Sequence, residues 1–416
     1  MNEKADSDLV KRQNRGLVLE ALRHAGPLAR IDLGRVTGLS LATISSISGH
    51  LIDEGLVRPL DAQALGNPHK RGRPLTLLDL SPGATHVVAV KLSVDGVELV
   101  LADFRGHVRQ RELLPIAVYD ADGARFGAMV ADAIAIFLSR RGIERRGVSR
   151  IGVAVQGVAA RRQGAVVWSP AFRARNIAIA GPIEDKLGIP VTLANDANMI
   201  AEALISGSPR RNRTTAVIFI GHGVGMGLIV GGEVYHGDTG AAAEFGHMNH
   251  LPYGALCRCG RQGCVEAYVA DYGILRAATG RGSDQQPPVG AVPDSRMLAL
   301  EQAALAGEAA AVQAFASAGE ALGFGIARVI ALINPSRIVL AGSGTRAMPL
   351  IEPHMRRAIV DGVVEELRRG VEIDVVPLAT DMIVKGTIES ALRHLDQEVY
   401  ARGASFEAAP LLRTAG

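Results

Sequence analysis

The 416-residue sequence predicts an α/β protein with a small helical unit at its N-terminus. From about residue 86 onward, the chain alternates apolar strands with helices, which is the pattern of α/β folds. Residues 13–57 instead predict three short helices. A hydrophobic content of 48% can fill the cores of two or three domains, and a net charge of +3 restricts any nucleic-acid contact to a local surface.

The first two helices of this unit are expected over residues 13–24 and 30–37. Gly38 then makes a turn, and Ser40 is placed to cap a third helix. A helix, a glycine turn and a capped helix in this order are typical of a helix-turn-helix motif.

The third helix has two distinct faces. Ile44, Ile47 and Leu51 share one face, which we expect to pack against the unit itself. Hydroxyl side chains fall elsewhere on the helix, at Thr43, Ser45, Ser46 and Ser48. Such a helix suits the major groove, because small polar side chains can reach base edges and phosphates. The candidate DNA contacts from this segment are Ser40, Thr43, Ser45 and Ser46.

A polar hairpin follows Val57 and carries Lys70, Arg71 and Arg73, which suit a wing that contacts phosphates or a minor groove. Residues 1–80 are therefore expected to form a winged helix-turn-helix domain. The alternative is a helical bundle that docks a protein partner beside an incidentally basic loop. That alternative is favoured by the modest balance of eleven Lys and Arg against nine Asp and Glu in this segment.

The α/β part begins with two adjacent strands over residues 86–104, followed by a helix over residues 121–141. A later strand over residues 190–196 ends in Asn195 and Asp196. Ligands of open α/β sheets bind at the carboxyl ends of strands. Asp196 is therefore a candidate general base for a sugar hydroxyl or a simple hydrogen-bond acceptor, and it could also cap the following helix.

Residues 214–237 predict a strand, a glycine-rich turn and a second strand. The glycines at positions 221, 223, 225 and 227 could let backbone N–H groups approach an anion, or could serve packing alone. Residues 321–344 predict a long helix, a strand and a glycine turn. The last helix is expected at Ile383–Leu395, and residues 403–416 are expected to be an unstructured tail.

All three cysteines, Cys257, Cys259 and Cys264, fall within eight positions, and His247 and His250 lie just upstream. Three thiolates and one imidazole form the tetrahedral set that Zn²⁺ prefers, so we expect a structural zinc site closed by either histidine. The alternative is a group of buried or free thiols.

Glu244 and Glu266 bracket the proposed ligands. A metal that fixes this loop would also hold the two carboxylates near one another, which suits the binding of a polyhydroxylated molecule.

The first fifteen residues are charged and lack an apolar core, which excludes a secretory signal. The most apolar long run, residues 216–232, contains six glycines and predicts paired strands better than a membrane span. We therefore expect a cytoplasmic protein without membrane contact. Aromatic residues make up only 4% of the chain, which argues against stacking platforms for single-stranded nucleic acid.

Together these motifs resemble the ROK family, whose name joins repressors, open reading frames and kinases. The resemblance covers residues 13 to about 400 and rests on EFGH with CRCGRQGCVE, LANDAN, GHGVGMG and INPSRIVLAGSG. The N-terminal unit followed by RGRP is similar to that of the family's sugar-responsive repressors.

The resemblance implies an actin-like (ribonuclease H-like) two-lobed sugar-kinase fold, a homodimer or homotetramer, and a sugar between the lobes. The first lobe would span residues 81–198 and be completed by residues 385–402. The second lobe, with the zinc site, would span residues 199–384.

Matched position by position, the family's zinc ligands correspond to His247, Cys257, Cys259 and Cys264, which leaves His250 spare. Its sugar-hydroxyl contacts correspond to Asn195, Asp196, Glu244, His247 and Glu266. His247 would then bridge metal and sugar. Asp196 matches the catalytic base of the kinases.

The chain departs from the kinases at both phosphate turns. The Asp-x-Gly-Gly-Thr turn is replaced by Lys91-Leu92-Ser93-Val94-Asp95, and Gly-Thr-Gly is replaced by Gly221-His222-Gly223. Bulky side chains obstruct the close backbone approach that phosphates need, so we expect a receptor and not an enzyme. Ala174-Arg175 stands where the family commonly has a Gly-Trp pair. Arg173 or Arg175 near the cleft would favour an anionic or phosphorylated sugar, or the two arginines are simply a solvated pair on a loop.

The sequence thus favours a DNA-binding transcriptional regulator, a repressor, whose affinity for operator DNA changes when a sugar or sugar derivative binds. One alternative is an ATP-dependent sugar kinase that retains a DNA-binding arm. Another is a regulator that acts through a protein partner and has no small-molecule effector.

Overall fold

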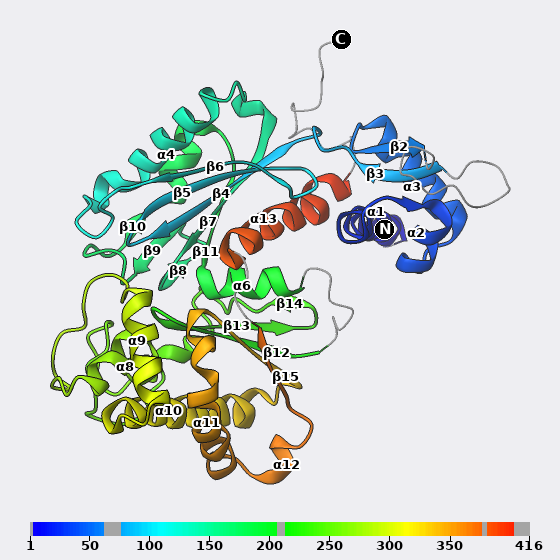
Figure 1. Cartoon of the computed structure of the whole chain (residues 1–416). Helices are drawn as coiled ribbons and strands as arrows, with labels where there is room; N and C mark the ends of the chain where they lie inside the picture. Colours follow the sequence, from blue (N-terminus) through cyan, green and yellow to red (C-terminus); the bar gives the residue numbers. More distant parts are fainter. Residues whose placement is uncertain (1–2, 62–75, 206–212, 377–380, 403–416) are drawn as a thin grey trace.

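Two five-stranded sheets form the body of the protein (Figure 1). The computed structural model describes residues 3–61, 76–205, 213–376 and 381–402. The strand orders are β11-β7-β4-β5-β6 and β14-β13-β12-β15-β16. In each sheet, three consecutive strands pair antiparallel, and two later strands extend the sheet in parallel from the first. The two sheets therefore repeat one topology, as the two-lobed expectation requires.

The first sheet is covered on both faces. Its strands are β4 (His86–Ser93), β5 (Gly96–Asp103), β6 (Val108–Leu114), β7 (Val148–Val155) and β11 (Val191–Asn195). Helices α4 (Gly123–Ser139) and α5 (Ala180–Leu187) share one apolar cluster with Val88 and Val90 of β4. The alternate residue Val87 faces α13 (Met382–His394). Burial on both faces explains why these strands are apolar almost throughout.

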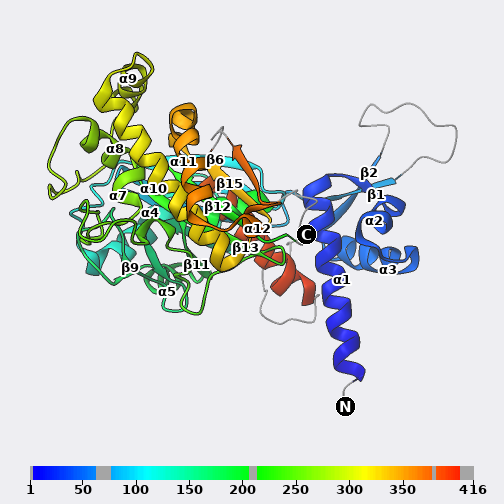
Figure 2. The ribbon, with the colours of Figure 1, turned by 90° about the horizontal axis from the view of Figure 1, so that it is seen from below.

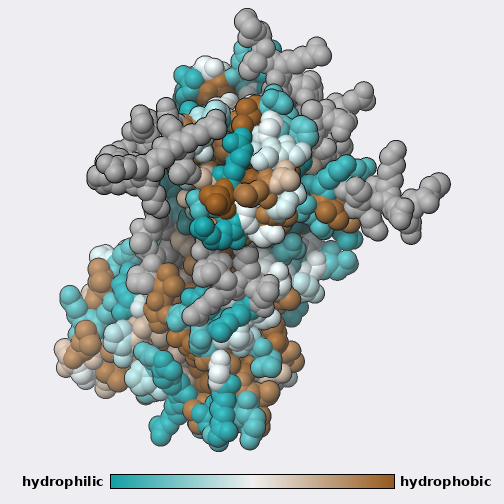
Figure 3. All heavy atoms as spheres, turned by 90° about the vertical axis from the view of Figure 1, so that its right-hand side faces the viewer, coloured by the Kyte–Doolittle hydropathy of each residue, from teal (hydrophilic) through white to brown (hydrophobic). Residues whose placement is uncertain are grey.

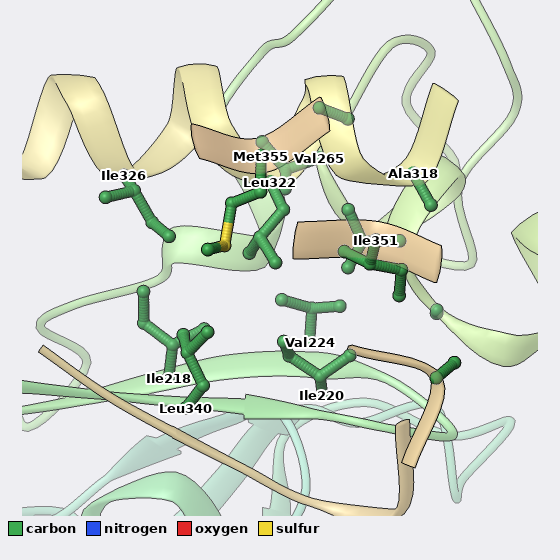
Figure 4. Close-up of a cluster of buried hydrophobic side chains, with 14 of the residues drawn as sticks. Ile218, Ile220, Val224, Val265, Ala318, Leu322, Ile326, Leu340, Ile351 and Met355 are labelled. Carbon is green, nitrogen blue, oxygen red and sulfur yellow. The ribbon is translucent and has the colours of Figure 1, made fainter. Parts of the chain in front are cut away.

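A small antiparallel sheet follows β7, with strands β8 (Val158–Ala160), β9 (Ala165–Trp168) and β10 (Ile177–Ala178). The second large sheet contains β12 (Thr215–Ile220), β13 (Val224–Val230), β14 (Glu233–Val234), β15 (Arg337–Ala341) and β16 (Glu372–Val376). Helices α10 (Ala309–Ile333) and α11 (Met348–Gly362) cover one face of it. Figure 4 shows this core, in which Leu322 and Met355 point toward Ile218 and Leu340 of the sheet.

The remaining helices of this part are α7 (Glu266–Val269), α8 (Asp271–Ala278), α9 (Asp294–Leu305) and α12 (Glu365–Arg368). Among the described residues, α10 is the one helix that is long and apolar enough to cross a membrane, and 61% of its most apolar stretch is buried inside the protein. Core helices of globular proteins share these properties.

Two helices lie between the large sheets and pack on each other: α6 (Asp196–Ile205) and α13. Their backbones approach closely at Gly386, where a Cβ atom would lie 1.6 Å from the carbonyl oxygen of Met199. Only glycine fits such a crossing. The expected last helix, Ile383–Leu395, is confirmed within one residue. It continues into the turns η5 (Leu395–Val399) and η6 (Tyr400–Arg402).

The described residues of the N-terminal unit form three helices, α1 (Glu3–Ala25), α2 (Arg30–Thr37) and α3 (Leu41–Asp53). It also contains a sheet of β1 (Leu28–Ala29), β3 (Thr76–Leu80) and β2 (Val57–Asp61), in that order. The bounds expected for the second helix are confirmed. The first was placed too late, because α1 begins at Glu3 and projects beyond the rest of the unit (Figure 2). Its early turns are charged and expose Leu9 and Val10, so they show no buried apolar stripe in the sequence.

The N-terminal unit shares a core with the first sheet and with α13. One apolar cluster joins Leu22 of α1, Ala89 of β4 and Ile388 of α13. A buried ion pair reinforces this contact, with Nη2 of Arg23 2.7 Å from Oδ1 of Asp396 in η5. The expected tail, residues 403–416, lies outside the described residues.

Candidate functional site in the interlobe cleft

Asn195 and Asp196 stand between the sheets, where β11 ends and α6 begins. Nδ2 of Asn195 donates to the carbonyl oxygen of Gly157 at 2.7 Å. The backbone N–H of Ala197 lies 2.7 Å from Oδ1 of Asn195 and 2.8 Å from Oδ1 of Asp196. Asp196 therefore helps to satisfy the start of α6, so the helix-capping interpretation is compatible with a role in the cleft.

Asp196 is electrostatically unusual. Burial raises its pKa to about 7, and the negative charge of Glu244 contributes to the rise, while Lys91 opposes it. A carboxyl group that titrates near neutral pH can both accept and donate a hydrogen bond there.

The five residues that match the family's sugar contacts line one pocket: Asn195, Asp196, Glu244, His247 and Glu266. Glu266 is almost fully buried. Its Oε2 accepts a hydrogen bond from the backbone N–H of Val224 at 3.2 Å, and its Oε1 accepts one from the Tyr272 hydroxyl at 3.2 Å. Glu244 lies 4.0 Å from Nε2 of His247, and burial raises the pKa of its carboxyl group.

The structure brings His247, Cys257, Cys259 and Cys264 together. Their candidate ligand atoms all lie within 4.8 Å of one another. Hydrogen bonds from Cys257 and Cys264 hold the pKa of the Cys259 thiol far below its ordinary value, which favours the thiolate that metals bind. Three sulfurs and one imidazole nitrogen in this space fit a tetrahedral metal ion.

His247, and not His250, belongs to this cluster. Nδ1 of His247 lies 3.7 Å from the sulfur of Cys257, while its Nε2 faces Glu244. The ring of His250 instead packs edge-on against Tyr268, with 5.0 Å between the ring centroids. The two ring nitrogens of His247 can therefore contact a metal and a ligand at the same time, as the resemblance implies.

Lys91, the first residue of the segment that replaces the Asp-x-Gly-Gly-Thr turn of the kinases, belongs to an ion-pair network. Lys91 lies near the end of β4, and its Nζ is 3.2 Å from Oδ2 of Asp381. Arg111 also binds Asp381, at 2.8 Å, and both cations pair with Glu98. Asp381 in turn caps α13 by accepting a hydrogen bond from the backbone N–H of Val384.

The glycine-rich hairpin serves close packing at three of its positions. A Cβ atom at Gly225 would lie 3.0 Å from Cβ of Ala197, and one at Gly227 would lie 2.6 Å from the Ala197 carbonyl oxygen. At Gly221 a Cβ atom would lie 2.6 Å from Oγ of Ser343. The packing alternative therefore explains Gly225 and Gly227 by the close crossing of β13 and α6, and Gly221 by its contact with Ser343.

Two residues of the cleft were missed by sequence reasoning. Trp168 lines the pocket, and its ring lies edge-on to His247 at 5.3 Å between centroids. Arg258, between two of the clustered cysteines, donates to the carbonyl oxygen of His222 at 2.6 Å and covers the ring of Tyr272. Trp168 is the only tryptophan in the chain, which was a usable signal. The position of Arg258 depends on the loop fold, which the sequence does not show.

Arg173 and Arg175 are exposed, and neither lines this pocket or the cavity next to it. Of the two interpretations made from the sequence, the solvated pair fits these positions. The backbone N–H of Arg173 donates to the carbonyl oxygen of Tyr119.

The third helix of the N-terminal unit has the expected cap and apolar face. Oγ of Ser40 accepts from the backbone N–H of Thr43 at 3.1 Å. The side chains of the apolar face are buried, namely Ile44, Ile47 and Leu51. Ser45 and Ser46 are exposed. The expectation for Ser48 is wrong, because it is fully buried and accepts a hydrogen bond from Nε of Arg30.

Lys70, Arg71 and Arg73 lie outside the described residues. The strands that flank their segment, β2 and β3, pair antiparallel from Val57↔Leu80 to Asp61↔Thr76. On this side of the molecule apolar and polar side chains are interspersed (Figure 3). Among the described residues, the large exposed apolar side chains of α2 and α3 are Ile31, Val36 and Leu41.

Two lobes of repeated topology, with a polar pocket where their strands end, define a protein of the actin-like sugar-kinase fold. The chain belongs to the ROK family, whose profile matches residues 87–382. A ROK family glucokinase from Streptomyces griseus shares the fold, with a TM-score of 0.57 and 23% identity over 74% of this chain and 99% of that one.

Regulators of the family match more of the chain. The DNA-binding transcriptional repressor Mlc of Escherichia coli (strain K12) is 26% identical over 85% of this chain and 86% of its own length. The xylose repressor of Bacillus subtilis (strain 168) is 25% identical over 89% and 92%. The solved structure of a ROK family transcriptional regulator, described as a homolog of the E. coli Mlc protein, has a TM-score of 0.73 and 26% identity, and covers 92% of this chain and 97% of that one.

Proposed function

We propose that this protein is a sugar-responsive transcriptional regulator, a repressor, that binds operator DNA and has lost kinase activity. The observation that carries the proposal is the contrast within one cleft. The residues that match the family's sugar contacts line one pocket. The first phosphate turn of the kinases is instead replaced by residues 91–95, of which Lys91 pairs with Asp381. The names of the related Mlc and xylose repressors, which concern DNA binding, repression and a sugar, support the same function.

On the carbohydrate side, the acceptor groups Asn195, Asp196, Glu244 and Glu266 would bind sugar hydroxyls, together with His247. Such a dense set of acceptors suits a ligand that offers many O–H donors. Trp168 adds a flat apolar surface on the same wall.

The alternative, an ATP-dependent sugar kinase, retains its candidate base in Asp196. Phosphoryl transfer depends on positioning the phosphates and on stabilising their charge. Val94 occupies the turn after β4, where glycines would allow backbone N–H groups to approach phosphate, and the Lys91 ammonium is bound by two carboxylates. We therefore expect no useful catalysis.

For DNA binding, we assign residues 1–80 to a winged helix-turn-helix domain. The exposed Ser45 and Ser46 of α3, with Ser40 and Thr43 at its start, would meet the major groove. Lys70, Arg71 and Arg73 would contact phosphates. Two such domains in a homodimer or homotetramer would read two half-sites.

Ligand occupancy would reach this domain through α13. This helix starts at the cleft, where Asp381 caps it, and it leads into η5, where Asp396 binds Arg23 of α1. Residues 81–198 with 385–402 would move as one lobe and residues 199–384 as the other. A ligand that contacts both lobes selects one separation of them, which changes the spacing of the two DNA-binding domains.

For the metal, we assign a structural Zn²⁺ to His247, Cys257, Cys259 and Cys264. The donor set and the spacing of its atoms support this ion. When bound, zinc would fix the loop that carries His247 and Arg258 into the cleft. The sugar itself would be bound by the protein side chains and not by the metal.

The proposal is tested by selecting binding sites from a random DNA pool with the full-length protein. The affinity of the selected site is then measured by fluorescence anisotropy with and without a panel of hexoses, pentoses, amino sugars and their phosphates. We expect one sugar class to change the affinity at least tenfold. If the protein selects no specific DNA sequence, the proposal is overturned. Specific DNA that no sugar affects would favour the regulator that acts through a protein partner.

A further inference from the structure

A second cavity adjoins the carbohydrate pocket and has a volume of about 460 Å³. The two spaces share Gln156, Asp196 and Arg258, so they form one continuous cleft. Apolar residues from several segments line much of this cavity: Val94, Pro170, Phe219, Met382 and Ile383. Its size and its lining are those of a small-molecule site.

The cations that face this cavity already have partners. Nζ of Lys91 lies 3.2 Å from Asp381, and Nδ1 of His222 lies 3.1 Å from the buried Asp271. The guanidinium group of Arg258 donates to two backbone carbonyl oxygens, at 2.6 and 2.7 Å. Among the described residues of this wall, Lys91 and His222 therefore each face a carboxylate of the protein, and the Arg258 guanidinium group is held by backbone carbonyl oxygens.

Two further carboxylates, Asp95 and Asp196, also line the cavity. A phosphate placed here would have to displace existing ion pairs and approach additional negative charge. Separating a partly buried pair leaves one charge uncompensated, which is costly. A neutral apolar group needs no such exchange and gains from leaving water. The cavity thus favours a neutral apolar group, whereas a nucleotide site would favour phosphate.

We infer that this cavity binds the aglycone of a neutral glycoside whose sugar ring occupies the adjoining carbohydrate pocket. The inference deepens the proposed function and rests on it, because it names the effector class of the same regulator. The effector is then larger than a monosaccharide: a sugar with an uncharged, largely apolar substituent. The cavity that would hold a nucleotide in a kinase would instead bind this substituent and so determine which glycosides bind.

The position of the aglycone also places it against the element that leads to the N-terminal unit. Met382 and Ile383 form the first turn of α13, directly after its cap Asp381. A free monosaccharide in the carbohydrate pocket alone would not reach these side chains. Glycosides should therefore change DNA affinity more than their parent sugars.

The test compares methyl and phenyl glycosides of glucose, galactose, mannose and xylose, in both anomers, by titration calorimetry on the full-length protein. For the sugar that binds, we expect the phenyl glycoside to bind about tenfold more tightly than the methyl glycoside, or better, because burying an aromatic group releases water from its surface. Glucose 6-phosphate and a non-hydrolysable ATP analogue serve as anionic probes and should not bind in the cavity.

Val94→Gln provides the matched variant, since Val94 lies in the turn after β4 and lines the cavity. It should reduce the phenyl advantage to about threefold or less and leave the methyl glycoside affinity unchanged. Val108→Gln, on the exposed edge strand β6, should change neither.

Equal affinity of methyl and phenyl glycosides would overturn the inference and leave the proposed function standing. A phenyl advantage that Val94→Gln leaves intact would also overturn it, because the aglycone would then bind elsewhere. Tight binding of the phosphate or of the ATP analogue in the cavity would do the same. If no sugar or glycoside of the panel binds, the inference fails, and the DNA-affinity measurement with the wider panel of sugars and sugar phosphates decides the proposed function separately.

Discussion

At the scale of single residues, Asp196 is the most informative group of the cleft. It is half-buried, its pKa is raised to about 7 mainly by burial, and it holds the start of α6. A kinase uses such a carboxyl group as a base. In a receptor the same group serves as a hydrogen-bond partner for a sugar hydroxyl.

The raised pKa makes a prediction about stability. Between the unfolded pKa of about 4 and the folded pKa of about 7, the folded state binds the Asp196 proton and the unfolded state does not. Stability therefore falls as pH rises through this window. Relative to wild type, Asp196→Asn should gain about 2 to 3 kcal/mol between pH 5 and pH 8.

Urea unfolding at the two pH values measures this difference. Asp185→Asn, at an exposed position of α5, is the control and should show no comparable change. A constant difference between Asp196→Asn and wild type from pH 5 to pH 8 would contradict a buried, titrating carboxyl group.

At the scale of elements, the crossing of α6 and α13 sets the distance between the lobes. We expect Gly386→Ala to destabilise the protein by about 1 to 3 kcal/mol or more, since its Cβ atom would lie 1.6 Å from a backbone oxygen of α6. Gly181→Ala in α5 meets nothing within 4 Å and should be stabilising by about 0.5 to 1 kcal/mol. Thermal unfolding of both variants checks the prediction, and equal effects would count against the close crossing.

The metal-binding loop is the second such element. Chelation of the metal should lower the midpoint of thermal unfolding, since the loop loses the ion that joins His247 to the cysteines. Sugar affinity should fall by roughly tenfold or more, because His247 and Arg258 are held by the same loop. Adding Zn²⁺ back should restore both. A metal-free protein with unchanged melting and sugar affinity would show that the cluster is only a group of thiols.

The elements also show how far sequence reasoning reaches. Strands and helices with a strong apolar period, such as α3, α13 and the paired strands around the glycine-rich hairpin, were predicted well. The cysteine spacing and the resemblance selected the residues that the structure brings together. The early turns of α1, the burial of Ser48 and the positions of Trp168 and Arg258 were not predicted. None of these features leaves a local apolar period in the sequence.

At the scale of the whole molecule, the buried pair Arg23–Asp396 joins the N-terminal unit to the end of the chain. Removing one partner leaves an uncompensated buried charge, so Asp396→Ala should destabilise the protein by about 3 to 5 kcal/mol. The exposed pair Arg35–Asp32 is the control, and Asp32→Ala should cost about 1 kcal/mol or less. Urea unfolding distinguishes the two, and similar small losses would mean that the two parts are not firmly joined.

The same topology occurs in both lobes, and the ligand residues lie where the parallel strands of the lobes end. This arrangement explains how one fold serves kinases and regulators. The residues that match the family's sugar contacts come from β11, α6, the loop around Glu244 and His247, and the start of α7, whereas phosphate binding depends on two turns. Substitutions in the turns can therefore remove catalysis and leave sugar recognition intact.

The central claim is that the cleft binds a carbohydrate and not ATP. Calorimetric titration of one protein preparation with the sugar or glycoside that gives the largest thermal shift, and then with a non-hydrolysable ATP analogue and Mg²⁺, tests it most directly. We predict one carbohydrate bound per chain and no heat from the nucleotide, with or without the carbohydrate. Saturable nucleotide binding that Lys91→Ala or Val94→Gln weakens would contradict the claim.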